Sequence, residues 1–269
     1  MFPLLIFAAA AGAATATPPK SEPPKDRGSA CARLAQVDPA RAIAEANAWR
    51  LVGGVISARQ CLGLAYVADE RWLSAATAFE QAARDAHNSN DSRVGALWSQ
   101  AGNAALAGGE AAKARGYLDS ALATGTLSDA MRGEVELDRA RADVALNDPV
   151  AARTDLNRAT QHVPDDPMVW LLSATLARKQ GEVDRAGADI AEAIKRAPDD
   201  PDVALEEGNV RAVAGDLAGA RLAWQRAVKT GGGLPSGKSA AAALQANADI
   251  NLDAPATDAP AQEGAPAAP

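Results

Sequence analysis

Residues 164–201 read PDDPMVWLLSATLARKQGEVDRAGADIAEAIKRAPDDP, and the motif Pro-Asp-Asp-Pro stands at both ends of this stretch. The motif at 164–167 therefore returns at 198–201, an offset of 34 residues. A fixed period of this length is typical of arrays built from one small helical unit.

Small and large residues recur at fixed positions when Pro167 is counted as position 1. Further units then begin at Ile56, Gly95, Gly133 and Pro201. Position 8 is small in all five units, as Gly63, Gly102, Ala140, Ala174 and Gly208. Position 24 is large in all five, as Phe79, Leu118, Leu156, Ile190 and Trp224. A small residue lets two helices approach closely, and the large residue fills the space between repeats.

This pattern resembles the tetratricopeptide repeat family, in an exported bacterial form. The resemblance implies an all-α fold, a right-handed superhelical solenoid of antiparallel helix pairs whose first helices line a concave groove. It covers an array over 30–230, with repeats starting at 56, 95, 133, 167 and 201. A degenerate unit, 30–55, precedes them, with its first helix over 30–37 and its second over 38–54.

The ends of the helices follow from the same register. Gly or Asn at position 15 suits the left-handed backbone that ends a first helix, and Pro at position 32 ends a second helix. The units before Gly95 and Gly133 are 39 and 38 residues long, and we expect their extra residues in turns. A Gly-rich linker and a solvating helix, Ser239 to Ile250, occupy 231–251 and cover the last repeat.

The two ends of the chain have different compositions. Residues 1–16 are apolar and end in Ala14-Thr15-Ala16, which predicts a signal peptide that is too short to span a bilayer. A Pro-rich linker follows over 17–29, and a Pro/Ala-rich acidic tail over 252–269 is expected to be disordered. The sequence thus favours a periplasmic or secreted protein with no integral membrane segment after cleavage; the alternative is a cytoplasmic one.

Composition limits the chemistry. With 27 Lys and Arg against 34 Asp and Glu, a net charge of −7 argues against nucleic acid as the partner. Two His and two Cys offer no metal site and no cofactor ligand set. His87 and His162 are expected at helix ends, and the pairs at 165–166 and 199–200 at helix starts.

One nucleotide-binding motif is matched by chance. Gly232, Gly237, Lys238 and Ser239 fit G-x-x-x-x-G-K-[ST]. A phosphate-binding loop follows a buried strand, however, whereas this match follows the second helix of a repeat. We therefore expect no catalytic residue and no enzyme activity, and the interpretation as a P-loop NTPase is disfavoured.

Cys31 and Cys61 are the two cysteines of the chain, and we expect them on the first helices of the degenerate unit and its neighbour. In an oxidising compartment they are candidates for a disulfide that joins the degenerate unit to the first complete repeat. In the cytoplasm they would be buried thiols.

The family resemblance also implies a binding face, at positions 2, 5, 9, 12 and 13 of the first helices. Carried onto this chain, those positions include Gln60, Leu64, Asn103, Leu106, Arg141, Val144, Leu171, Thr175, Arg178, Lys179, Leu205 and Asn209. The Lys and Asn clamp of the chaperone-binding members is not reproduced. The remaining pattern is an apolar floor with basic residues at 141, 178 and 179, which are either a carboxylate site or solvated side chains.

These observations predict a noncatalytic adaptor or scaffold that binds a peptide or helix of another protein in its groove, in the cell envelope. Two alternatives remain: a cytoplasmic scaffold of the same kind, and a structural protein that associates with itself. The identity of the partner and the oligomeric state cannot be read from the sequence.

Overall fold

The computed structural model describes residues 27–248, which form thirteen α-helices and no β-strand. The helices are α1 (Arg27–Val37), α2 (Pro39–Leu51), α3 (Val55–Ala68), α4 (Trp72–Asn88), α5 (Val94–Ala107), α6 (Ala111–Ala123), α7 (Asp129–Ala145), α8 (Pro149–His162), α9 (Pro167–Gln180), α10 (Val183–Arg196), α11 (Pro201–Val213), α12 (Leu217–Gly231) and α13 (Pro235–Ala246). The predicted signal peptide, most of the Pro-rich linker and the tail lie outside the described residues.

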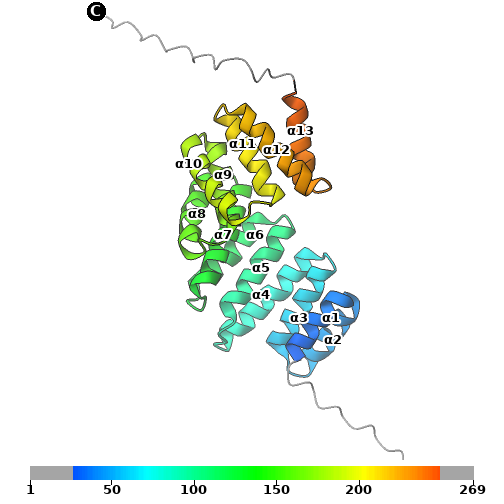
Figure 1. Ribbon diagram of the computed structural model, residues 1–269. Helices are drawn as coiled ribbons and strands as arrows, with labels where there is room; N and C mark the ends of the chain where they lie inside the picture. The colour runs from blue at the N-terminus through cyan, green and yellow to red at the C-terminus, as the bar shows by residue number, and fades with distance from the viewer. Residues whose placement is uncertain (1–26, 249–269) are drawn as a thin grey trace, which may run out of the picture.

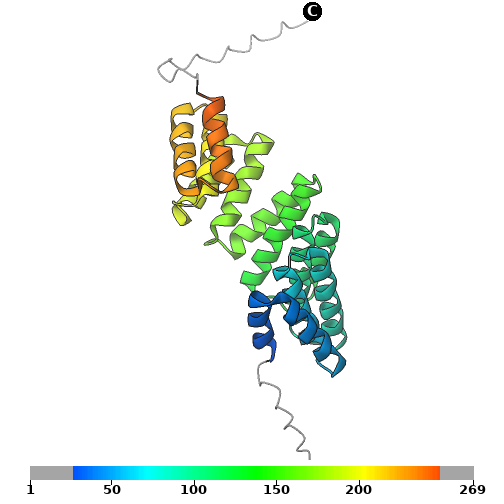
Figure 2. The same ribbon diagram turned by 90° about the vertical axis from the view of Figure 1, so that its right-hand side faces the viewer.

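The helices form an elongated stack that follows the order of the chain. Figure 1 shows α1 and α2 at one end and α13 at the other, and the turned view in Figure 2 shows the same succession of pairs. The pairs from α3–α4 to α11–α12 coincide with the five repeats, and each helix packs against the next. The predicted all-α solenoid of helix pairs is confirmed. Within residues 27–248, none of the helices combines the length and apolar character that a membrane span requires.

In every repeat, a residue with a left-handed backbone conformation lies in the turn that follows the first helix. Position 15 has a positive φ in all five: Glu70 54°, Gly109 77°, Asn147 59°, Gly181 77° and Gly215 85°. Glycine and asparagine adopt this conformation readily, but glutamate does not. At Glu70, two backbone hydrogen bonds hold the turn: Glu70 N donates to Val67 O at 3.0 Å, and Arg71 N to Tyr66 O at 2.8 Å.

Positions 8 and 24 pack directly against each other within a repeat. A Cβ added at Gly63 would lie 2.5 Å from the ring of Phe79, and one at Gly208 would lie 2.3 Å from the ring of Trp224. Such distances are too short for any side chain, so both positions require glycine. Position 8 therefore sets how closely the two helices of a repeat approach.

Aspartate side chains begin several of the helices. Asp166 accepts a hydrogen bond from Met168 N at 2.8 Å, and Asp200 accepts from Asp202 N at 2.8 Å. Proline follows each of these caps at the first helical position, where its missing N–H group costs nothing. The acidic pairs at 165–166 and 199–200 thus contribute helix caps.

Some helix boundaries differ from the expected ones. The extra residues of the two longer units do not lie only in turns: α4 runs to Asn88, and α7 begins four residues before Gly133. Added residues at the end of a helix leave the packed face of the remaining turns in place, so the array tolerates them. At the N-terminus, α1 begins at Arg27, three residues before the expected start.

The last helix, α13, begins at Pro235 instead of Ser239, so the Gly-rich connection is shorter than expected. Gly237 lies inside this helix, and a Cβ added there would be 2.0 Å from Gly231 O at the end of α12. Its glycine therefore serves the contact between α12 and α13. The residues that match the phosphate-loop motif lie between two helices and on α13, and helix α12, not a strand, comes directly before them. Ile250 lies outside the described residues.

Cys31 on α1 and Cys61 on α3 are linked in the structure, with their Cα atoms 5.8 Å apart. This separation is within the usual range for a disulfide. Both side chains are buried and pack with Ala46 and Trp49 of α2. The link therefore lies in the core of the N-terminal unit, where it joins the degenerate unit to the first complete repeat.

Candidate partner-binding site

The first helices of the repeats form the more closely packed layer of the array. Among helices two apart in the chain, substantial packing joins the odd-numbered ones: α1 with α3, α5 with α7, α9 with α11 and α11 with α13. In a curved stack, the elements that approach one another lie on the inner side. The candidate binding residues on the first helices therefore belong to the inner side of the stack.

Polar side chains connect neighbouring first helices. Gln60 Nε2 on α3 donates to Gln100 Oε1 on α5 at 3.1 Å. Arg178 on α9 donates through Nε and Nη2 to the two carboxylate oxygens of Glu206 on α11, at 2.6 and 3.1 Å. Glu206 is buried, so this paired contact is shielded from solvent. Each of these contacts bridges the inner layer between two repeats.

A third connection joins α5 to α7 through Asp138. The side chain of Asn103 hydrogen-bonds to Asp138, and Arg141 Nη1 donates to Asp138 Oδ1 at 2.8 Å. Burial raises the pKa of Asp138, and the neighbouring guanidinium of Arg141 opposes that rise. Arg141 is thus partly neutralised on its own helix.

The inner layer opens between α7 and α9. These two helices are not packed against one another as α9 and α11 are, and no side-chain hydrogen bond or ion pair joins them within residues 27–248. A pocket of about 180 Å³ lies there, lined by Ala140, Arg141, Val144, Leu156, Leu172, Thr175, Leu176 and Lys179. We call it the α7–α9 pocket. A dry apolar cavity of ~150 Å³ holds a benzene molecule, so this one has room for an aliphatic or aromatic side chain.

The walls of the α7–α9 pocket are apolar and its rim carries positive charge. Lys179 lies at the exposed end of α9 and makes no ion pair with residues 27–248. Arg178, beside it, is held by Glu206. Lys179 is therefore the cation at this rim that can receive a carboxylate from another molecule.

The structure separates the other predicted groove residues. Gln60 and Leu64 line a different hollow, beside α1. Leu171 is 7% exposed and packs in the core between α9 and α10, because position 5 faces the partner helix here. Asn209 accepts a hydrogen bond from Trp224 Nε1 at 3.1 Å, so its amide serves internal packing. Leu106 and Leu205 also pack partly against core clusters.

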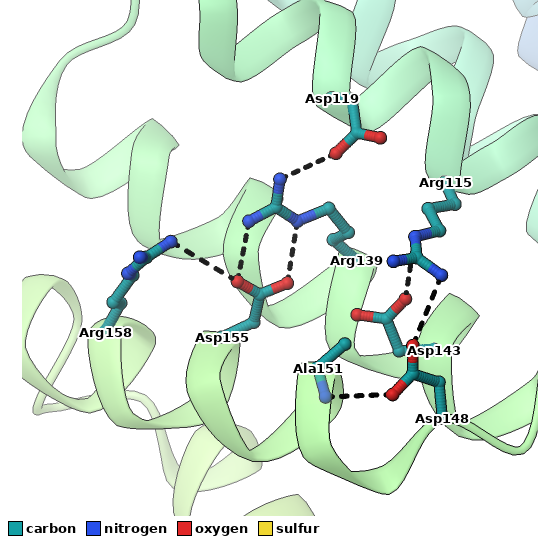
Figure 3. Close-up of polar contacts among 8 residues, drawn as sticks. All are labelled: Arg115, Asp119, Arg139, Asp143, Asp148, Ala151, Asp155 and Arg158. Carbon is teal, nitrogen blue, oxygen red and sulfur yellow. Dashed lines mark hydrogen bonds and ion pairs between the residues drawn. The ribbon is translucent and has the colours of Figure 1, made fainter.

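An ion network that was not predicted fixes α7, one wall of the pocket (Figure 3). Arg139 on α7 donates through Nε and Nη2 to both oxygens of Asp155 on α8, at 2.7 and 2.6 Å. Its Nη1 donates to Asp119 on α6 at 2.7 Å. These hydrogen bonds raise the pKa of Arg139, so its guanidinium stays charged. Positions 7 and 23 supply the first pair. Aspartate recurs at position 23 as Asp189, but arginine stands at position 7 in this repeat alone of the five, so the ion pair leaves no periodic signal in the sequence.

The second part of the network lies at the α6–α7–α8 junction. Arg115 Nε lies 3.2 Å from Asp143 Oδ1, and Arg115 Nη1 lies 3.5 Å from Asp148 Oδ2. Asp143 is buried, and its Oδ1 accepts no hydrogen bond. Burial raises the pKa of Asp143 to about 6, against the effect of Arg115. Asp143 therefore titrates near neutral pH.

Chemical groups that could act in catalysis are dispersed. His87 is exposed in the last turn of α4, and His162 ends α8, where its Nδ1 lies 2.7 Å from Oε2 of the buried Glu136. Within the described residues, no group of three or more His, Cys, Asp or Glu side chains is placed to hold a metal ion. The α7–α9 pocket contains neither histidine nor carboxylate. It is suited to binding.

The sequence profile of the Tetratricopeptide repeat family matches residues 62–129, 137–201 and 171–246, which together make up more than half of the chain. No curated protein matches the sequence significantly.

Solved structures show the same fold. PilF of Pseudomonas aeruginosa is 15% identical with a TM-score of 0.63, over 81% of this chain and 98% of that one. PilW, described as a widely conserved type IV pilus biogenesis factor, is 16% identical with a TM-score of 0.64, over 79% and 97%. YrrB, described as a TPR protein with an unusual peptide-binding site, is 16% identical with a TM-score of 0.53, over 75% and 98%.

Proposed function

Because this chain belongs to the tetratricopeptide repeat family, we propose that it is a noncatalytic adaptor that binds a segment of another protein along its first helices. The central contact of this binding face is the α7–α9 pocket. The partner segment places an aliphatic or aromatic side chain in the pocket and a carboxylate on Lys179.

The interruption of the inner layer at α7–α9 carries this proposal. On either side of it, polar side chains connect neighbouring first helices. Their hydrogen-bonding groups are occupied by one another, as in the pair Arg178–Glu206. At α7–α9 the corresponding space is apolar and open, and Lys179 stands at its rim without an ionic partner among residues 27–248. An apolar pocket with one oriented charge favours a ligand of matching shape and opposite charge.

Rigidity of the pocket adds to its affinity. Arg139 holds α7 against α6 and α8, and Ser173 donates to Asp189 Oδ2 at 2.6 Å, which ties α9 to α10. The pocket walls are therefore ordered before a partner arrives. A preformed surface loses little conformational entropy on binding, so the ordering cost falls mainly on the partner segment.

We place this adaptor in the cell envelope. Two features support the location: the apolar segment 1–16 with its Ala14-Thr15-Ala16 end, and the link between Cys31 and Cys61. Fractionation of cells tests it. The proposal expects a chain without residues 1–16 in the periplasmic or secreted fraction, and a full-length chain in the cytosol would contradict it.

In-cell photocrosslinking tests the binding face. A photoreactive amino acid replaces Thr175 at the pocket rim, and in a control it replaces Glu192 on α10. We expect one protein to be captured from position 175 and not from 192. The capture should be lost when Lys179→Glu is added and kept with Lys229→Glu, which changes an exposed lysine of α12. Equal capture from 175 and 192, or capture that ignores Lys179→Glu, would refute this binding face.

A further inference from the structure

A short acidic and aliphatic segment follows the last helix of the array. Residues 249–253 read DINLD, and residues 249–269, which lie outside the described part of the chain, contain four acidic residues and no Lys or Arg. Ile250 and Leu252 are the large aliphatic residues of this stretch. Ile250 directly follows Asp249, and Leu252 directly precedes Asp253. This is the chemistry that the α7–α9 pocket accepts under the function proposed above.

The point where this segment leaves the array is well defined. Asn247 follows α13, and its carbonyl oxygen accepts a hydrogen bond from Arg221 Nη2 on α12 at 2.7 Å. Its Nδ2 donates to Ala243 O on α13 at 2.8 Å. In Figure 1, α13 lies at the end of the stack, whereas α7 and α9 lie nearer the middle. Because α13 packs on α11 and α11 packs on α9, one helix lies between α13 and α9, and two helix-to-helix spacings separate their axes.

Leu252 cannot reach the pocket of its own chain. It lies four residues after Ala248, and a fully extended chain spans at most ~3.6 Å per residue, about 14 Å in all. Packed helix axes are ~8–10 Å apart, so the axes of α13 and α9 are separated by about 16–20 Å, and the pocket lies beyond α9. The later residues 254–269 can span the distance, but they include no side chain larger than Gln or Glu to fill an apolar pocket.

We propose that residues 249–253 of one copy bind the α7–α9 pocket of a second copy, with Leu252 in the apolar cavity and Asp253 on Lys179. Complementary charge favours this pairing, since the segment is acidic and the rim is basic. The donor segment and the acceptor pocket are different surfaces of the same chain. Such a contact is head to tail, so each added copy leaves one free pocket and one free segment, and the assembly grows until a ring closes.

Sedimentation velocity on the full chain tests the self-association. Wild type should increase in mass beyond a dimer as its concentration rises. Leu252→Asp removes the donor side chain and Lys179→Glu reverses the acceptor charge, and each variant alone should stay monomeric. Lys179 is exposed, so its substitution should leave the fold intact, which the circular dichroism spectrum checks. Lys229→Glu, the matched control, should associate like wild type.

Mixing the two defective variants makes the test specific. Leu252→Asp keeps an intact pocket and Lys179→Glu keeps an intact segment, so together they should form a complex of one copy each that grows no further. Wild type that stays monomeric at all concentrations, association that persists in Leu252→Asp, or a mixture that stays monomeric would each overturn the proposal. Photocrosslinking from position 175 in the Leu252→Asp background separates the two proposals. If another protein is still captured and Lys179→Glu abolishes the capture, the adaptor function stands even when self-association fails. If the capture no longer depends on Lys179, the adaptor function is refuted separately.

Discussion

Replacing Gly208 by alanine tests how position 8 controls the packing of a helix pair. The new Cβ would lie 2.3 Å from Cδ1 and Nε1 of Trp224. The indole has little freedom to move away, because it is 4% exposed and its Nε1 donates to Asn209 Oδ1 at 3.1 Å. Inserting a methyl group into a packed core costs ~1–3 kcal/mol, and alanine recovers ~0.5–1 kcal/mol in a helix interior. We expect a net loss of about 1–2 kcal/mol in the free energy of unfolding.

Gly116 provides the matched control, since it lies in the interior of α6 with no atom within 4 Å of an added Cβ. Gly116→Ala should stabilise the protein by ~0.5–1 kcal/mol. Urea unfolding followed by circular dichroism measures both variants. The same substitution should thus change stability in opposite directions, and equal effects at 208 and 116 would refute the packing argument.

A double substitution tests the pairing itself. Gly208→Ala combined with Trp224→Leu gives this repeat the combination found at Ala140 and Leu156. The leucine leaves room for the new methyl group, so the double variant should lose less stability than the sum of the two single losses. Additive losses would show that positions 8 and 24 do not act on each other.

Three further predictions concern buried polar groups and the cysteines. The pKa of Asp143 is raised from 3.8 to about 6, so its protonated form stabilises the fold below pH 3.8, and this stabilisation is lost as the pH rises through 6. Asp143→Asn should therefore become more stable relative to wild type as the pH rises from 4 to 7. Parallel urea titrations should show a gain on the order of 1–3 kcal/mol in the free energy of unfolding. Reduction should add the mass of two hydrogens to the intact chain and cost ~3–4 kcal/mol of stability for the 30-residue separation of Cys31 and Cys61, whereas an unchanged mass would contradict the link. Ser173→Ala removes the hydroxyl that donates to the buried Asp189, and it should lower the free energy of unfolding by ~1–3 kcal/mol and with it the melting temperature. An unchanged melting temperature would show that the contact is dispensable.

The sequence predicted those features of the fold that depend on one residue type at one repeat position. Small residues at position 8 and large ones at position 24 identified the helix pairs, and the structure places them in contact. The residue type does not explain the backbone conformation of Glu70. Glutamate is unfavourable with positive φ, so its left-handed conformation follows from the surrounding turn and not from its own preference.

The binding site was less predictable because it depends on differences between repeats. The family pattern placed Val144, Thr175 and Lys179 on the inner face, and the structure brings them to one pocket. The same pattern placed Leu171 there, although that side chain is buried. The opening between α7 and α9 results from the spacing of the two helices and from the absence, within residues 27–248, of a side chain that connects them. Neither feature recurs from repeat to repeat, so the repeat pattern of the sequence does not reveal it.

The link between Cys31 and Cys61 has a consequence for proteolysis. It closes a covalent ring that contains the end of α1, all of α2 and the start of α3. A protease that cuts once inside this ring, for instance at the glycines 53 and 54 between α2 and α3, releases no fragment until the cysteines are reduced. The nicked chain should therefore migrate as one species on a non-reducing gel and as two on a reducing gel.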